Sequence, residues 1–257
     1  MSTRKFSLVL FAFALVFCIC TVPASANLLG NGSFEFPVVD PTSQCGQYAY
    51  CHGFHTDPTY PPSDTMIGNW VVIGTSDIDC TSGTCVPNGA PAPVMLMTDQ
   101  YQETIGGVVG ADPLYFHVED GNQAVDLTGE GNEGNNGIKQ SVTLGPGDYH
   151  LSFWLGNQDD KAPGYGLPSS IGLFINGAWQ KDFSTDQNTP SDITWQQFFY
   201  DFSASGYTTI AFLNETPNGD NYAGLDNVVL TQTPEPGSLA LLGAGLGGLM
   251  LSRRRRE

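Results

Sequence analysis

The sequence predicts an all-β fold, a single jelly-roll β-sandwich, for the body of the chain. Three observations favour this class. Apolar residues alternate with a period of two, and no stretch of the body shows the 3.6-residue apolar period of an amphipathic helix. Glycine is abundant, with 31 residues among 257. Gly and Pro turns separate the alternating stretches, and many short strands joined by such turns are typical of sandwiches and jelly rolls.

The alternation assigns individual side chains to the two faces of each strand. Leu151, Phe153 and Leu155 share one parity, so they are expected to face the core. Trp154 has the opposite parity and is expected to face outward. The same pattern predicts strands at residues 70–73, 115–118, 123–127, 138–144, 149–155, 171–175, 196–202, 208–213 and 225–230.

Turn residues separate these strands. Asn176-Gly177 predicts a type I′ hairpin turn after the strand at 171–175. Gly145-Pro146-Gly147-Asp148 predicts a turn between two further strands. Residues 37–67 and 74–114 are rich in Pro, Gly, Ser, Thr and Asp, and we expect them to be long loops.

Charge divides the chain into three parts. The chain has 9 Lys and Arg against 26 Asp and Glu, which gives a net charge of −17. Six of the nine cations lie in the two terminal segments, so the body between Asn27 and Gln232 holds three Lys against 24 carboxylates, a net charge of −21. This balance excludes a nucleic-acid-binding protein, which needs a basic patch to neutralise phosphates.

Residues 1–26 are predicted to be a signal peptide. Arg4 and Lys5 precede a long apolar stretch, and Ala24-Ser25-Ala26 has the small-x-small pattern of a cleavage site. Cleavage after Ala26 would leave Asn27 as the first residue of the mature protein. The alternative is an uncleaved anchor helix.

The C-terminal end is predicted to reach the membrane. Residues 231–236 form a Pro-rich linker, residues 237–252 a transmembrane helix, and residues 253–257 a basic cytoplasmic tail. The apolar segment is short for a span, which usually needs about 20 residues, but snorkelling Arg side chains can make up the difference. The positive-inside rule keeps the Arg cluster in the cytoplasm and places residues 27–230 outside.

This ending resembles the PEP-CTERM sorting signal of bacterial surface proteins in order, spacing and position. The resemblance implies that an exosortase, a membrane transpeptidase-like enzyme, recognises the signal and removes it near the Pro-Glu-Pro motif. It also implies export through an inner-membrane-anchored precursor to the cell surface or extracellular matrix, and the alternative is an ordinary tail anchor. Besides the Gly-rich apolar segment, the matching residues are Pro234, Glu235, Pro236, Arg253, Arg254, Arg255 and Arg256.

A second resemblance covers much of residues 27–230. Asn31-Gly32-Ser33-Phe34-Glu35 is similar to the opening strand of galactose-binding-like jelly rolls and carbohydrate-binding modules, and Gly224-Leu225-Asp226-Asn227-Val228 is similar to their closing strand. The resemblance implies a structural Ca²⁺ between these two strands, with Glu35 and Asp226 as oxygen ligands. The alternative is that both carboxylates are solvated or simply hydrogen-bonded.

Four cysteines remain after the signal peptide, and an even number in an exported chain suggests two disulfides. Three pairings are possible, and close spacing favours Cys45 with Cys51 and Cys80 with Cys85. A zinc site in the same region is the alternative, although its spacing fits no common pattern. Its ligands would be Cys45, Cys51, His52 and His55.

Sugar binding would need exposed aromatic side chains as flat platforms and polar side chains as hydrogen-bond partners. Trp154 is the leading candidate because it is expected to face away from the core. The full set of aromatic and polar candidates is Trp154, Tyr165, Trp179, Trp195, Tyr207, Asn157, Gln158 and Asp159.

Enzyme signatures are missing from the body, which has no Gly-x-Ser-x-Gly elbow, no His-Glu-x-x-His, no P-loop and no Arg. We therefore expect a non-enzymatic exported protein of the cell surface or extracellular matrix, with polysaccharide as its candidate ligand and structural Ca²⁺ as its candidate metal. One alternative is a structural matrix or adhesion protein without a small ligand. The other is a secreted glycan-active hydrolase, which would need two suitably spaced carboxyl groups, and nothing in the sequence selects such a pair.

Overall fold

The structure is a computed structural model, and it confirms the all-β class. It describes residues 26–40, 44–45, 48–49, 51–54, 65–74, 94–103, 114–115, 117–129, 136–157, 168–186, 193–216 and 222–233. Within these ranges every regular element is a β-strand, and no helix there is long and apolar enough to cross a membrane. The predicted signal peptide up to residue 25 and the predicted transmembrane helix lie outside the described residues.

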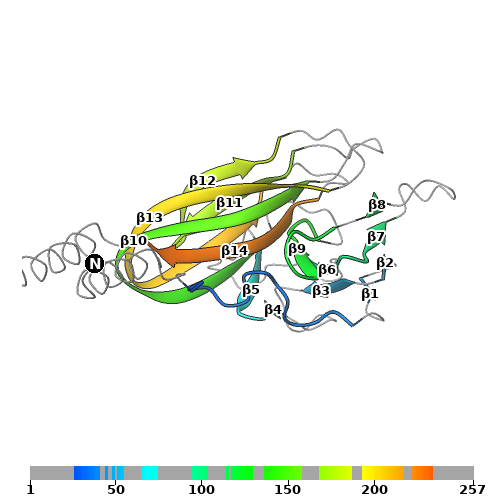
Figure 1. The fold of residues 1–257 in the computed structure, drawn as a ribbon, viewed down its shortest axis with the longest axis horizontal. Coiled ribbons are helices and arrows are strands. Elements are labelled where there is room, and N and C mark those ends of the chain that lie inside the picture. The colour runs from blue at the N-terminus through cyan, green and yellow to red at the C-terminus, as the bar shows by residue number, and fades with distance from the viewer. Residues whose placement is uncertain are drawn as a thin grey trace, which may run out of the picture.

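Ten strands form one sheet (Figure 1). Its order is β12-β11-β13-β10-β14-β9-β6-β3, while β5 pairs with β10 and β4 pairs with β5. Two further pairs, β1 with β2 and β7 with β8, form small separate sheets. The strands are β1 (Gln44–Cys45), β2 (Tyr48–Ala49), β3 (Cys51–Phe54), β4 (Met66–Ile67), β5 (Trp70–Gly74), β6 (Val94–Thr98), β7 (Gln102–Glu103), β8 (Leu114–Tyr115), β9 (Gln123–Asp126), β10 (Asn136–Asn157), β11 (Ser170–Ile175), β12 (Ala178–Ser184), β13 (Thr194–Asn214) and β14 (Gly224–Gln232).

Two long strands, β10 and β13, curl this sheet over on itself. The first half of β10 pairs with the end of β13 and with β5, and its second half pairs with the start of β13 and with β14. The sheet bends at a register shift between Leu144 and Gly147, opposite Ala204 and Gly206. The turn expected at residues 145–148 is therefore a bend within one strand, because pairing with β13 continues on both sides of it.

The two halves of the curled sheet enclose one core. Phe153 of β10 packs edge to face on Phe212 of β13, with ring centroids 5.0 Å apart, and Trp70 of β5 lies 6.1 Å from Phe212. All three side chains are fully buried, and full burial of a large apolar side chain stabilises a fold by about 1.5–3 kcal/mol. Leu151, Phe153 and Leu155 are buried and Trp154 is half-buried on the other face, as the alternation predicts.

Several strands lie in the regions expected to be loops, and β3 and β6 are the longest of them. β3 and β6 pair with each other, and β6 also pairs with β9, so both belong to the main sheet. Val94, Met95, Leu96 and Met97 of β6 are all buried, because both faces of this part of the sheet are covered. Such a strand shows no alternation. Conversely, the strand expected at 115–118 shrinks to β8, and residues 117–118 lie outside any strand.

Candidate functional site

The outer surface of β13 and β10, in the half of the sheet that includes β14, carries a row of aromatic and polar side chains. The register places Asp201 opposite His150, Phe199 opposite Ser152, and Gln197 opposite Trp154. These residues have the parity opposite to the buried core residues of the same two strands. We call this surface the β10–β13 face, and it consists of His150, Ser152, Trp154, Trp195, Gln197, Phe199 and Asp201.

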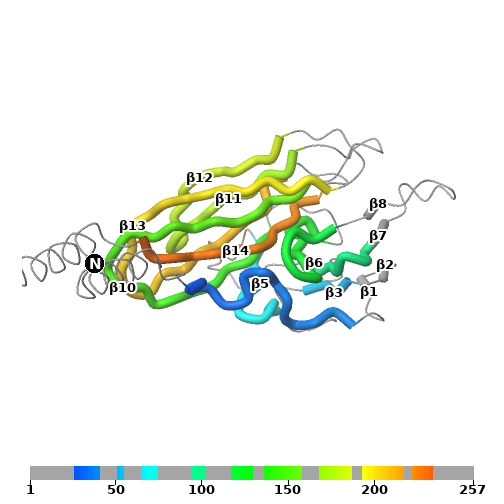
Figure 2. The backbone as a smooth tube through the Cα atoms, in the orientation of Figure 1, coloured from blue at the N-terminus to red at the C-terminus, as the bar shows by residue number. Residues whose placement is uncertain are grey.

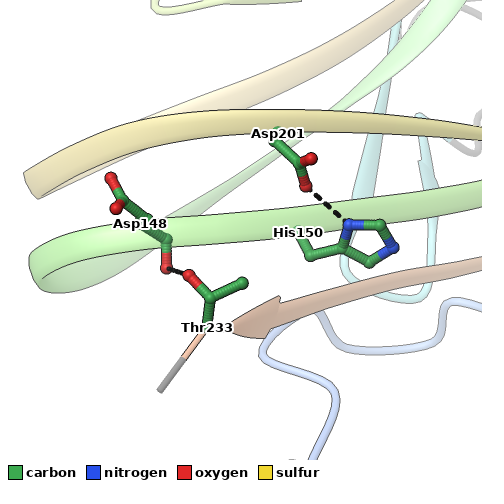
Figure 3. A network of polar contacts seen from close by, with 4 residues as sticks. All are labelled: Asp148, His150, Asp201 and Thr233. Atoms are coloured by element: carbon green, nitrogen blue, oxygen red, sulfur yellow. Dashed lines mark hydrogen bonds and ion pairs between the residues drawn. The ribbon is translucent and has the colours of Figure 1, made fainter. Parts of the chain in front are cut away.

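Phe199 is the most exposed aromatic ring of the β10–β13 face. Its side chain is 52% exposed, and its ring stacks on the His150 imidazole with centroids 5.4 Å apart and planes 25° apart. His150 is fixed in turn by Asp201, because Nδ1 of the histidine lies 2.6 Å from Oδ1 of the aspartate (Figure 3). The face thus presents a solvent-exposed ring that its neighbours hold in place.

The other end of the β10–β13 face carries two tryptophans. Trp195 is half-buried, and its Nε1 donates to the backbone oxygen of His117 at 2.8 Å. Its ring covers Gly156, where an added Cβ would come within 2.9 Å of the ring carbons. Trp154 is half-buried beside Gln197. The face therefore combines fixed rings with amide, hydroxyl and carboxylate groups.

The structure separates several side chains that the sequence grouped as sugar-binding candidates. Trp179 is 58% exposed but lies on β12, in the opposite half of the curled sheet, where its Nε1 donates to Asp182 Oδ1 at 2.6 Å. Asn157 is buried at the end of β10, and its Nδ2 donates to the backbone oxygen of Asp186 at 3.3 Å. Tyr207 is 72% exposed at the bend of β13.

Sequence reasoning missed Phe199, Gln197, His150 and Asp201 as members of one surface. The signal was present, because the alternation that predicts inward-facing Phe198 also turns Phe199 outward. What the sequence did not contain was the pairing of β10 with β13, which brings the two rows together.

Asp226, one of the two predicted calcium ligands, is a fully buried carboxyl group on β14. Its Oδ2 accepts hydrogen bonds from the backbone nitrogens of Glu119 at 3.1 Å and Asp120 at 2.9 Å. Its Oδ1 accepts a hydrogen bond from the backbone nitrogen of Asn227 at 2.7 Å. Burial raises the pKa of Asp226 to about 8, since removal from water disfavours the charged form more than these hydrogen bonds favour it.

Glu35, the second predicted ligand, contacts the same loop that holds Asp226. Its Oε1 accepts from the backbone nitrogens of Asn122 at 2.7 Å and Gln123 at 3.0 Å, and its Oε2 accepts from Asn122 Nδ2 at 3.1 Å. Gly121 permits this approach, because an added Cβ would lie 2.3 Å from Glu35 Oε1 and its φ is +71°. The structure thus brings both carboxylates to the loop at residues 119–123.

The donor set of this loop suits a hard cation in part. Asp226 and Glu35 each accept three hydrogen bonds, and because a carboxylate has about four acceptor positions, each keeps about one position for a cation. Asp120 adds negative charge beside Asp226. Oxygen ligands of this kind are those that Ca²⁺ takes. Within the described ranges, however, no group of three or more His, Cys, Asp or Glu side chains could hold a metal ion, so backbone oxygens or water would have to complete the shell.

A carboxyl pair lies in the opposite half of the sheet. Asp182 and Glu215 are hydrogen-bonded through their side chains, and burial together with the Asp182 charge raises the pKa of Glu215. Two carboxyl groups that share a hydrogen bond, as Asp182 and Glu215 do, lie closer together than the roughly 5 Å that separates the two catalytic carboxyl groups of a retaining glycosidase. This geometry does not favour glycoside hydrolysis at the pair.

Cys51 is buried at the start of β3 and is disulfide-bonded. Its partner is not among the described side chains, so the pairs Cys45–Cys51 and Cys80–Cys85 stay predictions. Other predicted site residues lie outside the described residues altogether. They are His55, Gln158, Asp159, Tyr165, Cys80, Cys85 and all of the sorting-signal residues from Pro234 to Arg256.

Comparison with known families bears on the C-terminal end. Residues 232–256 match the family model of the PEP-CTERM protein-sorting motif. The match confirms the predicted sorting signal, and such a signal indicates an exported, surface-targeted protein. A search of the curated proteins finds no match to this chain.

Comparison with solved structures finds carbohydrate-binding modules among the structures similar to this chain. The TmCBM61 module in complex with β-1,4-galactotriose has 15% identity and a TM-score of 0.41, covering 81% of this chain and 100% of that one. A CBM4 structure has 15% identity and a TM-score of 0.33, covering 79% and 99%. A native family 35 module from Clostridium thermocellum has 14% identity and a TM-score of 0.32, covering 64% and 98%. These likenesses concern the fold.

Proposed function

We propose that this chain is an exported protein of the cell surface or extracellular matrix whose β-domain binds polysaccharide on the β10–β13 face. The sorting motif at residues 232–256 supports the first part. The second part is carried by Phe199, whose exposed ring is stacked on a histidine that an aspartate fixes.

Sugar rings have apolar C–H faces and polar edges, and this surface suits both. An exposed ring that is already held in place loses little side-chain freedom when a ligand stacks on it, so more of the contact energy remains as affinity. Gln197, Ser152 and Asp201 adjoin the rings and supply donors and acceptors for hydroxyl groups. Because the body has a net charge of −21 and no Arg, the expected ligand is a neutral glycan rather than an anionic one.

We include a structural Ca²⁺ at the loop of residues 119–123 in this proposal, held by Glu35 and Asp226. Ionisation of a fully buried carboxyl group with a pKa near 8 is costly at neutral pH unless a cation compensates the negative charge. The ion would supply that compensation and fix the first and last parts of the domain to one loop. No catalytic role follows from this arrangement, and we propose a non-enzymatic protein.

The proposed route to the surface has four parts. The signal peptide ends at Ala26, residues 237–252 anchor the precursor, an exosortase-type enzyme processes it near Pro234-Glu235-Pro236, and two disulfides form after export. Intact-mass measurement on the mature protein tests signal cleavage, processing and disulfide formation, and co-sedimentation of the unprocessed precursor with membranes tests the anchor. We expect a chain that begins at Asn27, ends close to the Pro-Glu-Pro motif and contains no free thiol, whereas a mature chain that retains Arg253 to Arg256 would contradict the processing step.

Affinity gel electrophoresis of the mature protein against a panel of neutral polysaccharides tests the binding function. We expect retardation by at least one glycan, which Phe199→Ala weakens at least tenfold. Trp179→Ala is the matched control, because Trp179 is similarly exposed but lies on the opposite half of the sheet. Equal retardation of both variants would remove the β10–β13 face as the site, and no retardation by any glycan would favour a structural matrix protein without a small ligand.

A further inference from the structure

The last strand of the domain ends against the bend of the sheet. The bend end, as we call it, consists of residues 144–148 of β10 and residues 203–207 of β13. Thr233 donates to the backbone oxygen of Asp148 from its nitrogen at 2.9 Å and from Oγ1 at 2.8 Å (Figure 3). The residue directly before Pro234 is therefore fixed on the bend end.

The first residue of the body is fixed to the same strand. The side-chain amide of Asn27 pairs with β14 as a neighbouring peptide would, since Nδ2 donates to Val228 O at 2.8 Å and Oδ1 accepts from Leu230 N at 2.9 Å. Leu28 N also donates to Leu230 O at 2.9 Å, and Val228 N donates to Gly32 O at 2.8 Å. The chain from residue 27 to residue 32 thus runs antiparallel to β14, and its start points toward the bend end (Figure 2).

Both connections to the predicted membrane segments are short. From Thr233 to Gly237, where the apolar C-terminal segment begins, four residues can span at most about 14 Å. Before signal cleavage, the five residues from Val22, the end of the apolar part of the signal peptide, to Asn27 can span at most about 17 Å. The interfacial layer of a bilayer is itself roughly 5–7 Å thick on each side, so neither connection lets the domain turn another end toward the membrane.

We propose that the bend end is the surface that the precursor presents to the membrane, with the exposed ring of Tyr207 in contact with the lipid headgroup layer. This inference rests on the proposed membrane segment at residues 237–252. Tyr207 is 72% exposed and follows Gly206, whose φ is +82°, and Tyr side chains are enriched at membrane interfaces.

The charges of the bend end select the lipid. Residues 144–148 and 203–207 contain no Lys or Arg, so nothing there attracts anionic headgroups. Their one carboxylate, Asp148, accepts from Ser203 Oγ at 2.6 Å. A zwitterionic phospholipid surface therefore fits better than an anionic one. The opposite end of the domain, about 33 Å away along β10 from Gly147 to Asn157, would face away from the membrane.

Lipid quenching of a site-specific fluorophore tests this orientation. The signal-cleaved chain, residues 27–257, is reconstituted in phosphatidylcholine vesicles that contain headgroup-spin-labelled lipid. One variant carries the label at Tyr207→Cys, and its matched control carries it at Asp186→Cys, an exposed position at the opposite end. A third variant, Ser205→Cys, guards against misfolding of the first, because Ser205 is also exposed on the bend end.

We expect quenching at positions 207 and 205 to be at least threefold stronger than at position 186. If all three positions are quenched equally in chains that float with the vesicles, the membrane-facing role of the bend end is overturned. A protein partner would then be the candidate occupant of this surface. Chains that do not float with the vesicles would overturn this proposal together with the proposed membrane segment, so the two failures are distinguishable.

Discussion

Replacement of Asp226 by Asn is the perturbation for which the structure gives the sharpest expectation. Burial raises the pKa of Asp226 from its usual 3.8 to about 8. Between these two values the native state keeps a proton that the unfolded chain has released. Without a bound cation, the contribution of this group to stability is therefore fully present below pH 3.8 and is lost as pH rises toward 8, by about 1.4 kcal/mol per pH unit.

The Asp226→Asn variant cannot ionise at this position, so it should escape that loss. The free energy of unfolding of the variant, minus that of the wild type, is expected to rise by about 3 kcal/mol between pH 5 and pH 7 in the presence of a chelator. A constant offset of about 1–3 kcal/mol is expected as well, because the amide cannot accept all the hydrogen bonds of the carboxylate. Urea unfolding at pH 5, 6 and 7 measures both quantities, with Asp186→Asn as an exposed control for the charge change.

Calcium extends the same experiment to the proposed metal. Saturating Ca²⁺ should stabilise the wild type by several degrees in melting temperature at pH 7 and should leave Asp226→Asn nearly unchanged. A pH-independent difference between variant and wild type would refute the argument from the buried proton. Equal stabilisation of both proteins by Ca²⁺ would refute the role of Asp226 as a ligand.

Four further substitutions test the packing of the fold, each by urea denaturation. Phe212→Ala should lower the free energy of unfolding by about 3–5 kcal/mol, because Phe212 is fully buried between the two halves of the sheet; a loss below 1 kcal/mol would contradict the single shared core. Gly137→Ala should destabilise the fold severely, because the added Cβ would lie 1.9 Å from the backbone oxygen of Phe212. Gly177→Ala should lower the free energy of unfolding by only about 1 kcal/mol, because Gly177 lies in open space at φ +76°. An equal loss of stability in the two variants would show that the close approach of the Phe212 backbone to Gly137 does not determine the effect. Tyr149→Phe should cost about 1–2 kcal/mol, because it removes the 2.7 Å hydrogen bond to Gly145 O, and an unchanged stability would show that the bend does not depend on that bond.

Sequence alternation predicted those parts of the fold in which one face of a strand is buried and the other is wet. The strands around Leu151, Leu173 and Phe198 and the turn at Asn176-Gly177 were found in this way. β6 was missed because both of its faces are covered, which removes the alternation. The continuity of β10 through Gly145-Pro146-Gly147 was missed because those residues are ordinary turn formers, and only the pairing with β13 makes them a bend.

The candidate site was predicted less completely than the fold. Trp154 was assigned correctly to the outer surface from its parity alone. Its neighbours Phe199 and Gln197 come from a strand about forty residues later, and a pairing at that distance leaves no local signal. The burial of Asp226 was also beyond sequence reasoning, because Asp residues are mostly exposed and its loop partners at residues 119–120 lie more than a hundred positions away.

A fluorescence titration with a polysaccharide retained by the electrophoresis panel tests the glycan-binding face most directly. The chain has four Trp residues. Trp70 is fully buried, Trp154 and Trp195 lie on the β10–β13 face, and Trp179 lies on the opposite half of the sheet. We predict a ligand-induced change in emission that Trp154→Phe reduces by at least half and that Trp179→Phe leaves intact. A change that disappears in Trp179→Phe and persists in Trp154→Phe would place the ligand on the other half of the sheet and contradict the account.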